Sequence, residues 1–184
     1  MTAPATTLRQ DIKVMSLVGA AHWASHFFQL VLPALFLFLR DDFQVSFAAL
    51  GLLTTLLYGA SGLAQTPAGF LVDRFGARTV LLSGLTLASV ATLAVGLAPS
   101  YGYLVPLAIL AGLGNSVFDP ADLAILTSKV SPHRLGRGYA THALCGNLGW
   151  AAAPILMIGL AEMWDWRVAI MSAGIIGLAI VAAF

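Results

Sequence analysis

The stretch Gly69-Phe70-Leu71-Val72-Asp73-Arg74-Phe75-Gly76-Ala77-Arg78 is a charged, glycine-bearing turn between two long apolar runs. Its charged side chains are Asp73, Arg74 and Arg78. Only 9% of the 184 residues are charged, so charge gathered at one turn needs a physical reason. The composition of the surrounding chain gives the first part of that reason.

The composition indicates that most of this chain is solvated by lipid. Hydrophobic residues make up 59% of it, and the mean hydropathy is +0.90. Soluble domains carry about 25% charged residues, and a small domain cannot hide all of its apolar surface. Backbone exposed to lipid must satisfy its own hydrogen bonds, and the apolar runs are too long for barrel strands. We therefore predict an all-α membrane protein.

The apolar runs predict six transmembrane helices, because about 20 apolar residues cross the hydrocarbon core. The expected spans are residues 14–39, 46–72, 79–98, 103–128, 138–160 and 166–184. A short polar tail, residues 1–13, precedes them and is expected to fray. The last span ends without a lysine or arginine anchor, which suggests a piece of a longer protein.

The distribution of lysine and arginine predicts the orientation in the membrane. The tail and the turns after the second and fourth spans carry most of these residues: Arg9, Lys13, Arg74, Arg78, Lys129, Arg134 and Arg137. The opposite side carries only Arg40 and Arg167. The positive-inside rule therefore places the N-terminus in the cytoplasm. Aromatic residues at the other end are expected to form part of an outer interfacial belt: Tyr101, Tyr103, Trp164 and Trp166.

Polar side chains share one face of the first span. His22, His26 and Gln29 recur at steps of three and four residues, and they would be costly facing lipid. We expect them to face a cavity or the bundle interior. His22 and His26 have a spacing that allows metal binding, but no third ligand can be named. We therefore expect no metal and no cofactor.

The fourth span carries a second polar face, with Gly112, Asn115, Asp119 and Asp122. Asp119 lies about 24 Å from the outer end at a rise of 1.5 Å per residue. Pro120 should kink the helix there, and a carboxyl group beside a kink in the membrane is a functional candidate. We expect Asp122, a turn nearer the cytoplasm, to pair with an arginine at the interface.

Small residues line one face of the second span and one face of the fifth. The second span carries Gly51, Thr55, Gly59, Gly62, Thr66 and Gly69, which allows either a sliding interface or plain tight packing. The fifth span carries His142 beside Gly138, Gly146 and Gly149. His142 lies at about the depth of Asp119, and the two could pair if their helices adjoin.

The stretch from Gly69 to Arg78 resembles the loop between helices 2 and 3 of the major facilitator superfamily. The resemblance rests on Gly69, Asp73, Arg74, Gly76 and Arg78 at the family's spacing. Thr79 replaces a further basic residue. Trp166-Arg167 also looks like the family, and Phe118-Asp119-Pro120-Ala121 with Gly146-Asn147-Leu148-Gly149 loosely resembles its fosmidomycin-resistance efflux group. The resemblance implies the N-terminal six-helix half-bundle, a 3+3 inverted repeat, of a twelve-helix transporter.

The resemblance also implies functional roles for residues. The expected substrate cavity comprises His22, His26, Gln29 and Asn115, and the expected proton-coupling residues are Asp119 and His142. The loop implies a cytoplasmic gate in which Asp73 meets a helix of the other half. Arg74 and Arg78 would tie that gate to Asp122.

These expectations describe a secondary transporter in the cell inner membrane. It would move a small organic solute by alternating access, as proton-coupled efflux, beside a second six-helix half. The alternative is a non-transporting membrane subunit, or a half-transporter that acts only as a dimer or with a second chain. An intramembrane enzyme would need a nucleophile and base or a metal set, and no spacing supports one. We expect no enzyme activity and no nucleic-acid partner.

Overall fold

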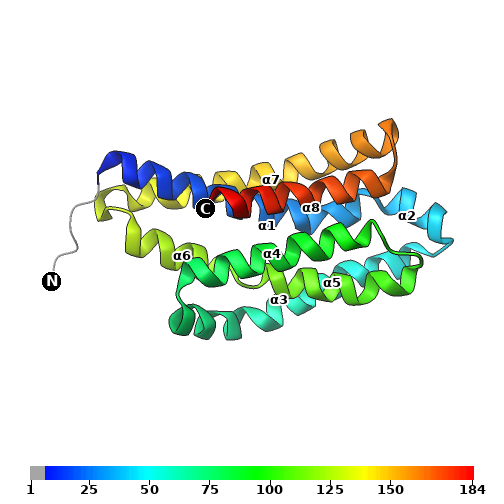
Figure 1. Cartoon of the computed structure of the whole chain (residues 1–184), viewed down its shortest axis with the longest axis horizontal. Helices are drawn as coiled ribbons and strands as arrows, with labels where there is room; N and C mark the ends of the chain where they lie inside the picture. Colours follow the sequence, from blue (N-terminus) through cyan, green and yellow to red (C-terminus); the bar gives the residue numbers. More distant parts are fainter. Residues whose placement is uncertain (1–6) are drawn as a thin grey trace.

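The computed structural model describes residues 7–184, so residues 1–6 of the expected tail lie outside the described residues. The expectation that the tail frays is wrong for residues 8–13, which belong to the first helix. The described chain is helical, without strands (Figure 1). Its α-helices are α1 (Leu8–Ala34), α2 (Phe36–Phe43), α3 (Phe47–Phe75), α4 (Ala77–Val95), α5 (Tyr101–Asn115), α6 (Phe118–Lys129), α7 (Leu135–Met163) and α8 (Trp166–Ala183). A 3-10 turn, η1 (Pro132–Arg134), precedes α7.

The first expected span is a bent pair of helices. Thr7 caps α1, and its side chain and that of Gln10 form a capping box, so the helix begins at Leu8 rather than at Val14. Pro33 lies in the last turn of α1, and α2 continues at an angle of 46°. The bend follows from the proline, which removes a backbone donor.

The fourth expected span is interrupted at the predicted place. α5 ends at Asn115 and α6 begins at Phe118, with Pro120 in its first turn. The kink predicted from Pro120 is therefore confirmed as a short break in the helix. The break lies between Asn115 and Asp119, so both polar residues sit beside irregular backbone.

The bundle is built from close helix pairs. α1 packs along α7, α3 along α5, and α4 between α5 and α8 (Figure 1). Glycines permit the closest approaches: a Cβ on Gly114 would lie 2.6 Å from the backbone nitrogen of Ala88. A Cβ on Gly149 would run into the carbonyl of Trp23, which fixes how closely α7 packs on α1.

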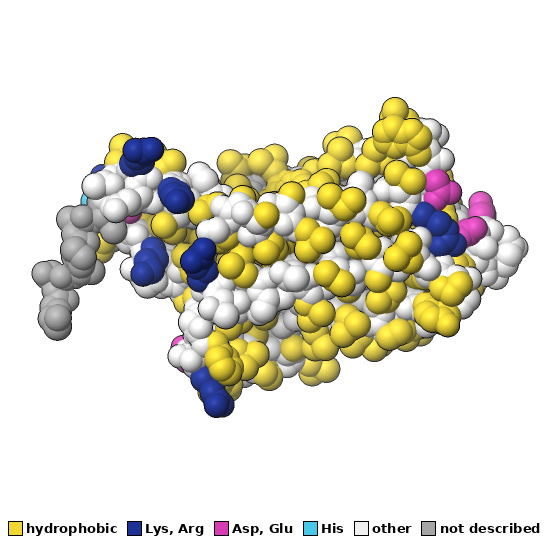
Figure 2. All heavy atoms as spheres, in the orientation of Figure 1, with side chains coloured by type: hydrophobic (Ala, Val, Ile, Leu, Met, Phe, Trp, Pro, Cys, Tyr) yellow, Lys and Arg dark blue, Asp and Glu magenta, His cyan; other side chains and the backbone are white. Residues whose placement is uncertain are grey.

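The outer surface matches a membrane protein. Five helical segments of the described chain are long and apolar enough to cross a membrane, and the bent α1–α2 pair would make a sixth. Figure 2 shows a largely apolar middle, with most lysine and arginine side chains gathered toward the end where α1 begins. The expected aromatic belt is only partly formed, because Trp166 is buried and Tyr101 is half-buried and donates to the carbonyl of Ala49.

Ion pairs tie helices together at both ends of the bundle, a largely buried one at one end and an exposed one at the other. Arg134 Nη1 lies 2.6 Å from Oδ2 of Asp11, which is fully buried, so the start of α1 is held to the α6–α7 connection. At the opposite end Arg167 pairs with Asp42 at 2.9 Å and donates to the carbonyl of Ala98. These contacts close the ends around a polar interior.

The charged stretch from Gly69 to Arg78 contains the end of α3 and the start of α4. Gly76 caps both helices with φ at +86°, a conformation that side chains with a Cβ rarely adopt. Asp73, Arg74 and Arg78 are exposed. The expected tie to Asp122 is wrong: Arg74 lies over the ring of Phe75, and Arg78 donates to the carbonyl of Phe184. Asp122 is buried inside the bundle, against His22 and His142.

Candidate functional site

A buried carboxylate forms the centre of the polar interior. Oδ2 of Asp122 in α6 lies 3.2 Å from Nδ1 of His22 in α1 and 3.2 Å from Nε2 of His142 in α7. The Asp122 side chain is 0% exposed. An ionised carboxylate only accepts hydrogen bonds, so in that state both nitrogens carry a proton. The expected arginine partner is therefore wrong, because α1 and α7 enclose Asp122 and offer imidazoles instead.

Aromatic rings stack outward from this carboxylate. The rings of His22 and His142 are stacked with their centroids 3.4 Å apart, and His26 lies 4.4 Å from His22. Trp150 lies 4.2 Å from His26, and its ring nitrogen donates to Oε1 of Gln29. A Cβ on Gly146 would lie 2.9 Å from both histidine rings of α1, so this glycine makes room for the stack.

The cluster contains buried polar atoms without a hydrogen-bond partner among the described residues. They are Oδ1 of Asp122 and Nδ1 of His26. Leaving a buried polar group unpaired costs about 1–3 kcal/mol, and more where the group is charged. Such atoms are rare in folded proteins and call for an explanation, such as an ion, a proton or a moving partner.

A polar cavity of about 230 Å³ adjoins the cluster. It lies where α1, α3 and the α5–α6 break face one another, and its lining is Ser25, His26, Gln29, Tyr58, Ser61, Gly62, Gln65, Asn115, Phe118 and Asp119. Hydrogen bonds order its wall: Ser25 donates to Asn115 at 2.8 Å, and Asn115 donates to Ser61 at 3.3 Å. The lining includes no lysine or arginine, and Asp119 is its charged residue.

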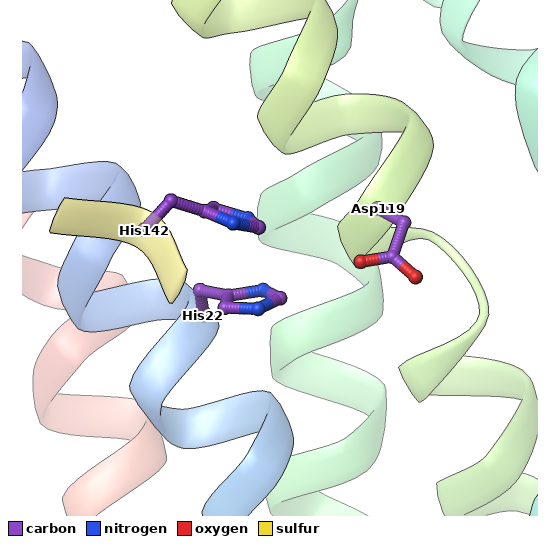
Figure 3. A group of neighbouring side chains, drawn as sticks. All are labelled: His22, Asp119 and His142. Atoms are coloured by element: carbon purple, nitrogen blue, oxygen red, sulfur yellow. The ribbon is translucent and has the colours of Figure 1, made fainter. Parts of the chain in front are cut away.

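Asp119 lies between the cavity and the histidines. Its Oδ2 accepts from Nε2 of Gln65 at 2.9 Å, and its side chain is exposed to the cavity. Figure 3 shows its carboxylate turned toward the rings of His22 and His142. One ligand atom from each of the three side chains lies within 4.8 Å of the others. The expected partner of His142 was Asp119, but His142 instead forms its hydrogen bond with Asp122, one turn further along α6.

The structure thus sorts the predicted site residues into groups. His26, Gln29 and Asn115 line the polar cavity with Asp119. His22 and His142 lie behind it against Asp122. The loop residues Gly69, Asp73, Arg74, Gly76 and Arg78 belong to neither group.

Sequence reasoning missed the contribution of α3. Tyr58, Ser61 and Gln65 line the cavity at steps of three and four residues. That periodic polar face was visible in the second span. The glycines of the same span favour helix packing, so the polar face was not recognised as part of a cavity.

Comparisons with known proteins agree with this architecture. The family model of the Major Facilitator Superfamily matches residues 17–184. An uncharacterized MFS-type transporter YfnC of Bacillus subtilis is 26% identical over 83% of this chain and 36% of its own length. The fosmidomycin resistance protein of Escherichia coli is 25% identical over 84% of this chain and 38% of its own length.

A solved structure gives the same fold. It is that of a bacterial homologue of the human lysosomal transporter Spinster, in an inward-facing and occupied conformation. The TM-score is 0.82 at 18% identity, over 97% of this chain and 44% of that one. The chain thus spans 36% to 44% of the length of these three proteins. With the matched residues and the six-span bundle taken together, this multi-pass membrane chain belongs to the Major Facilitator Superfamily.

Proposed function

We propose that this chain forms one half of a secondary transporter that moves a small organic solute by alternating access. The observation that carries the proposal is the polar cavity of about 230 Å³ inside an otherwise apolar bundle. Polar groups within a membrane are costly and are retained where they bind something that crosses. Membership of the superfamily supports the same conclusion.

The sequence and the names of the relatives support a proposed direction of transport and a proposed orientation in the membrane. Matched relatives include proteins named for fosmidomycin resistance and multidrug transport, which favours export. The excess of lysine and arginine at the end that carries the N-terminus favours a cytoplasmic N-terminus in the cell inner membrane.

Protons are the proposed driving ion. Asp119 faces the cavity, and the imidazoles of His22 and His142 bridge to the buried carboxylate of Asp122 behind it. All four side chains can take up and release protons, and they lie at the junction of α1, α6 and α7. A solute entering the cavity contacts Asp119 directly, so its binding can be coupled to the protonation of this group.

A second six-helix unit is the proposed partner. Gly51, Gly59, Gly62 and Gly69 of α3 have no atom within 4 Å of an added Cβ among the described residues. Small residues of this kind allow close helix approach in lipid. The matched relatives are more than twice as long as this chain, which leaves room for such a unit within one chain, and a second copy could supply it between chains. In either case Asp73 would meet a helix N-terminus of that unit.

Solute-driven proton flux tests the transport proposal. The purified chain is reconstituted in liposomes that contain a pH-sensitive dye, and fosmidomycin, nicotinate and L-galactonate are added in turn, as probes taken from the names of relatives. Proton movement that depends on one of these solutes supports coupled transport. Absence of such movement with every probe, and with a second six-helix half supplied, contradicts it.

A variant pair then tests the site. Asp119→Asn removes the carboxylate that faces the cavity, and coupled flux should fall at least tenfold. Glu162→Gln makes the same chemical change at an exposed position near the end of α7 and should leave the flux unchanged. Equal flux in the two variants would reject Asp119 as the coupling residue.

A further inference from the structure

A convergence of imidazole and carboxylate groups lies inside the bundle, contributed by three separate helices. His22 of α1, His142 of α7 and Asp119 of α6 place one ligand atom each within 4.8 Å of the others (Figure 3). The sequence had suggested His22 and His26 without a third ligand. Folding replaces His26 by a histidine from α7 and adds the missing carboxylate, a combination that no single-helix spacing could reveal.

The two imidazoles lie close enough to share a cation after a rotation of their rings. Their ring centroids lie 3.4 Å apart with the planes tilted by only 25°. Two nitrogens bound to one tetrahedral metal at 2.0–2.1 Å are about 3.3 Å apart. The nitrogen lone pairs lie in the ring planes, so these nearly parallel rings must turn toward each other to offer one nitrogen each to the same ion. The Asp119 carboxylate accepts a hydrogen bond from Gln65, and because it is exposed it can close the remaining gap by rotating.

Asp122 supplies the arrangement that metal-binding histidines require around them. Its Oδ2 lies 3.2 Å from one ring nitrogen of each histidine, which leaves the other ring nitrogen for a cation. A carboxylate that receives the second N–H of a ligating imidazole fixes the ring and increases its basicity. The other oxygen of Asp122 is buried without a hydrogen-bond partner in the described chain.

The charges of the groups point to a divalent ion. Asp119 and Asp122 bring two carboxylates into the membrane interior, and the adjoining cavity is lined by no lysine or arginine. A divalent cation would balance both. Imidazole and carboxylate together suit borderline first-row metals rather than calcium or magnesium, which prefer oxygen ligands alone.

We infer that His22, His142 and Asp119 form a binding site for a divalent transition-metal ion of the Zn²⁺ or Co²⁺ type, with Asp122 orienting the two imidazoles. A bound ion would link α1, α6 and α7 across the polar interior and occupy the groups proposed for proton coupling. Binding needs no transport, so this inference stands apart from the proposed function.

Direct titration tests the inference. Untagged protein in detergent is titrated with Co²⁺, whose visible absorption reports coordination by nitrogen and oxygen, and Zn²⁺ is then added as a competitor. One Co²⁺ should bind per chain and be displaced by Zn²⁺. His142→Ala and Asp119→Asn should each weaken binding at least tenfold. Asp122→Asn should weaken it about 10–100-fold, as loss of an orienting carboxylate does at other sites.

The matched control is His133→Ala, which removes an exposed histidine from η1, outside the cluster. Its Co²⁺ affinity should equal that of the unmodified chain. Asp119→Asn changes an exposed side chain, so it keeps the test decisive even where a buried histidine variant fails to fold. Absence of Co²⁺ binding, or equal affinity in folded Asp119→Asn and His133→Ala proteins, overturns the inference. Binding without solute-driven proton flux would retain this site and reject the transport proposal.

Discussion

Two glycine faces that look alike in the sequence differ in the structure. On α7, added Cβ atoms at Gly146 and Gly149 would collide with α1. On α3, Gly51, Gly59, Gly62 and Gly69 meet no atom within 4 Å among the described residues. The α7 face builds the bundle, whereas the α3 face is open. Glycine spacing therefore shows that a helix can be approached closely, but not which helix approaches it.

The largest expected effect comes from filling the packed face. Gly149→Val would place side-chain atoms against the backbone carbonyl of Trp23, which cannot move aside as a side chain can. We expect a loss of about 3 kcal/mol or more in unfolding free energy, at or above the upper range for overpacking. Thermal unfolding in detergent measures it.

Gly159→Val is the control on the same helix, because Gly159 has no atom within 4 Å of an added Cβ. Its unfolding temperature should stay close to that of the unmodified chain. Equal destabilisation by the two variants would mean that helix propensity, rather than contact with α1, dominates at both positions.

A smaller effect is expected from the buried carboxylate. Asp122→Ala leaves the protons of His22 and His142 without their acceptor, which should cost about 2–3 kcal/mol. Asp119→Ala, one turn earlier on α6, removes an exposed side chain and should change stability by about 0.5 kcal/mol or less. Chemical unfolding followed by circular dichroism compares them, and a reversed order would refute the assignment of Asp122 as the structural centre.

The charged turn gives a third contrast, with opposite signs. Gly76→Ala forces a Cβ into a backbone with φ at +86°, and we expect a loss of about 1 kcal/mol. Gly136 lies within helical α7 and has open space around it, so Gly136→Ala should increase the free energy of unfolding by up to about 1 kcal/mol. The denaturation midpoints of the two variants should therefore move in opposite directions. A shift in the same direction would show that the backbone at position 76 does not require glycine.

Much of the fold could be predicted from the sequence because lipid imposes simple rules. Apolar run length predicted the helices, and Pro120 predicted the break between α5 and α6. The bend at Pro33 was within reach, since the same argument applies to it. The sequence analysis did not predict that α1 begins at Leu8. That start depends on the capping box of Thr7 and Gln10, which lies in the expected polar tail.

The site was harder to predict because it joins residues from distant parts of the chain. Spacing placed His26, Gln29 and Asn115 on cavity-facing stripes, and the structure agrees. Spacing could not show that Asp122 turns inward to His22 and His142, because that depends on how α1, α6 and α7 pack. The sequence predicted an arginine partner because Asp122 was expected to lie at the membrane interface, whereas its side chain is buried inside the bundle.

The open α3 face carries the central claim, that this half works by closing against a second six-helix unit. The most direct measurement is solute-driven proton flux in Gly59→Leu protein whose unfolding temperature is unchanged, with Gly102→Leu, at an exposed position in the first turn of α5, as the control. The account predicts that flux is lost in Gly59→Leu and retained in Gly102→Leu. Full flux in a normally folded Gly59→Leu protein would contradict it.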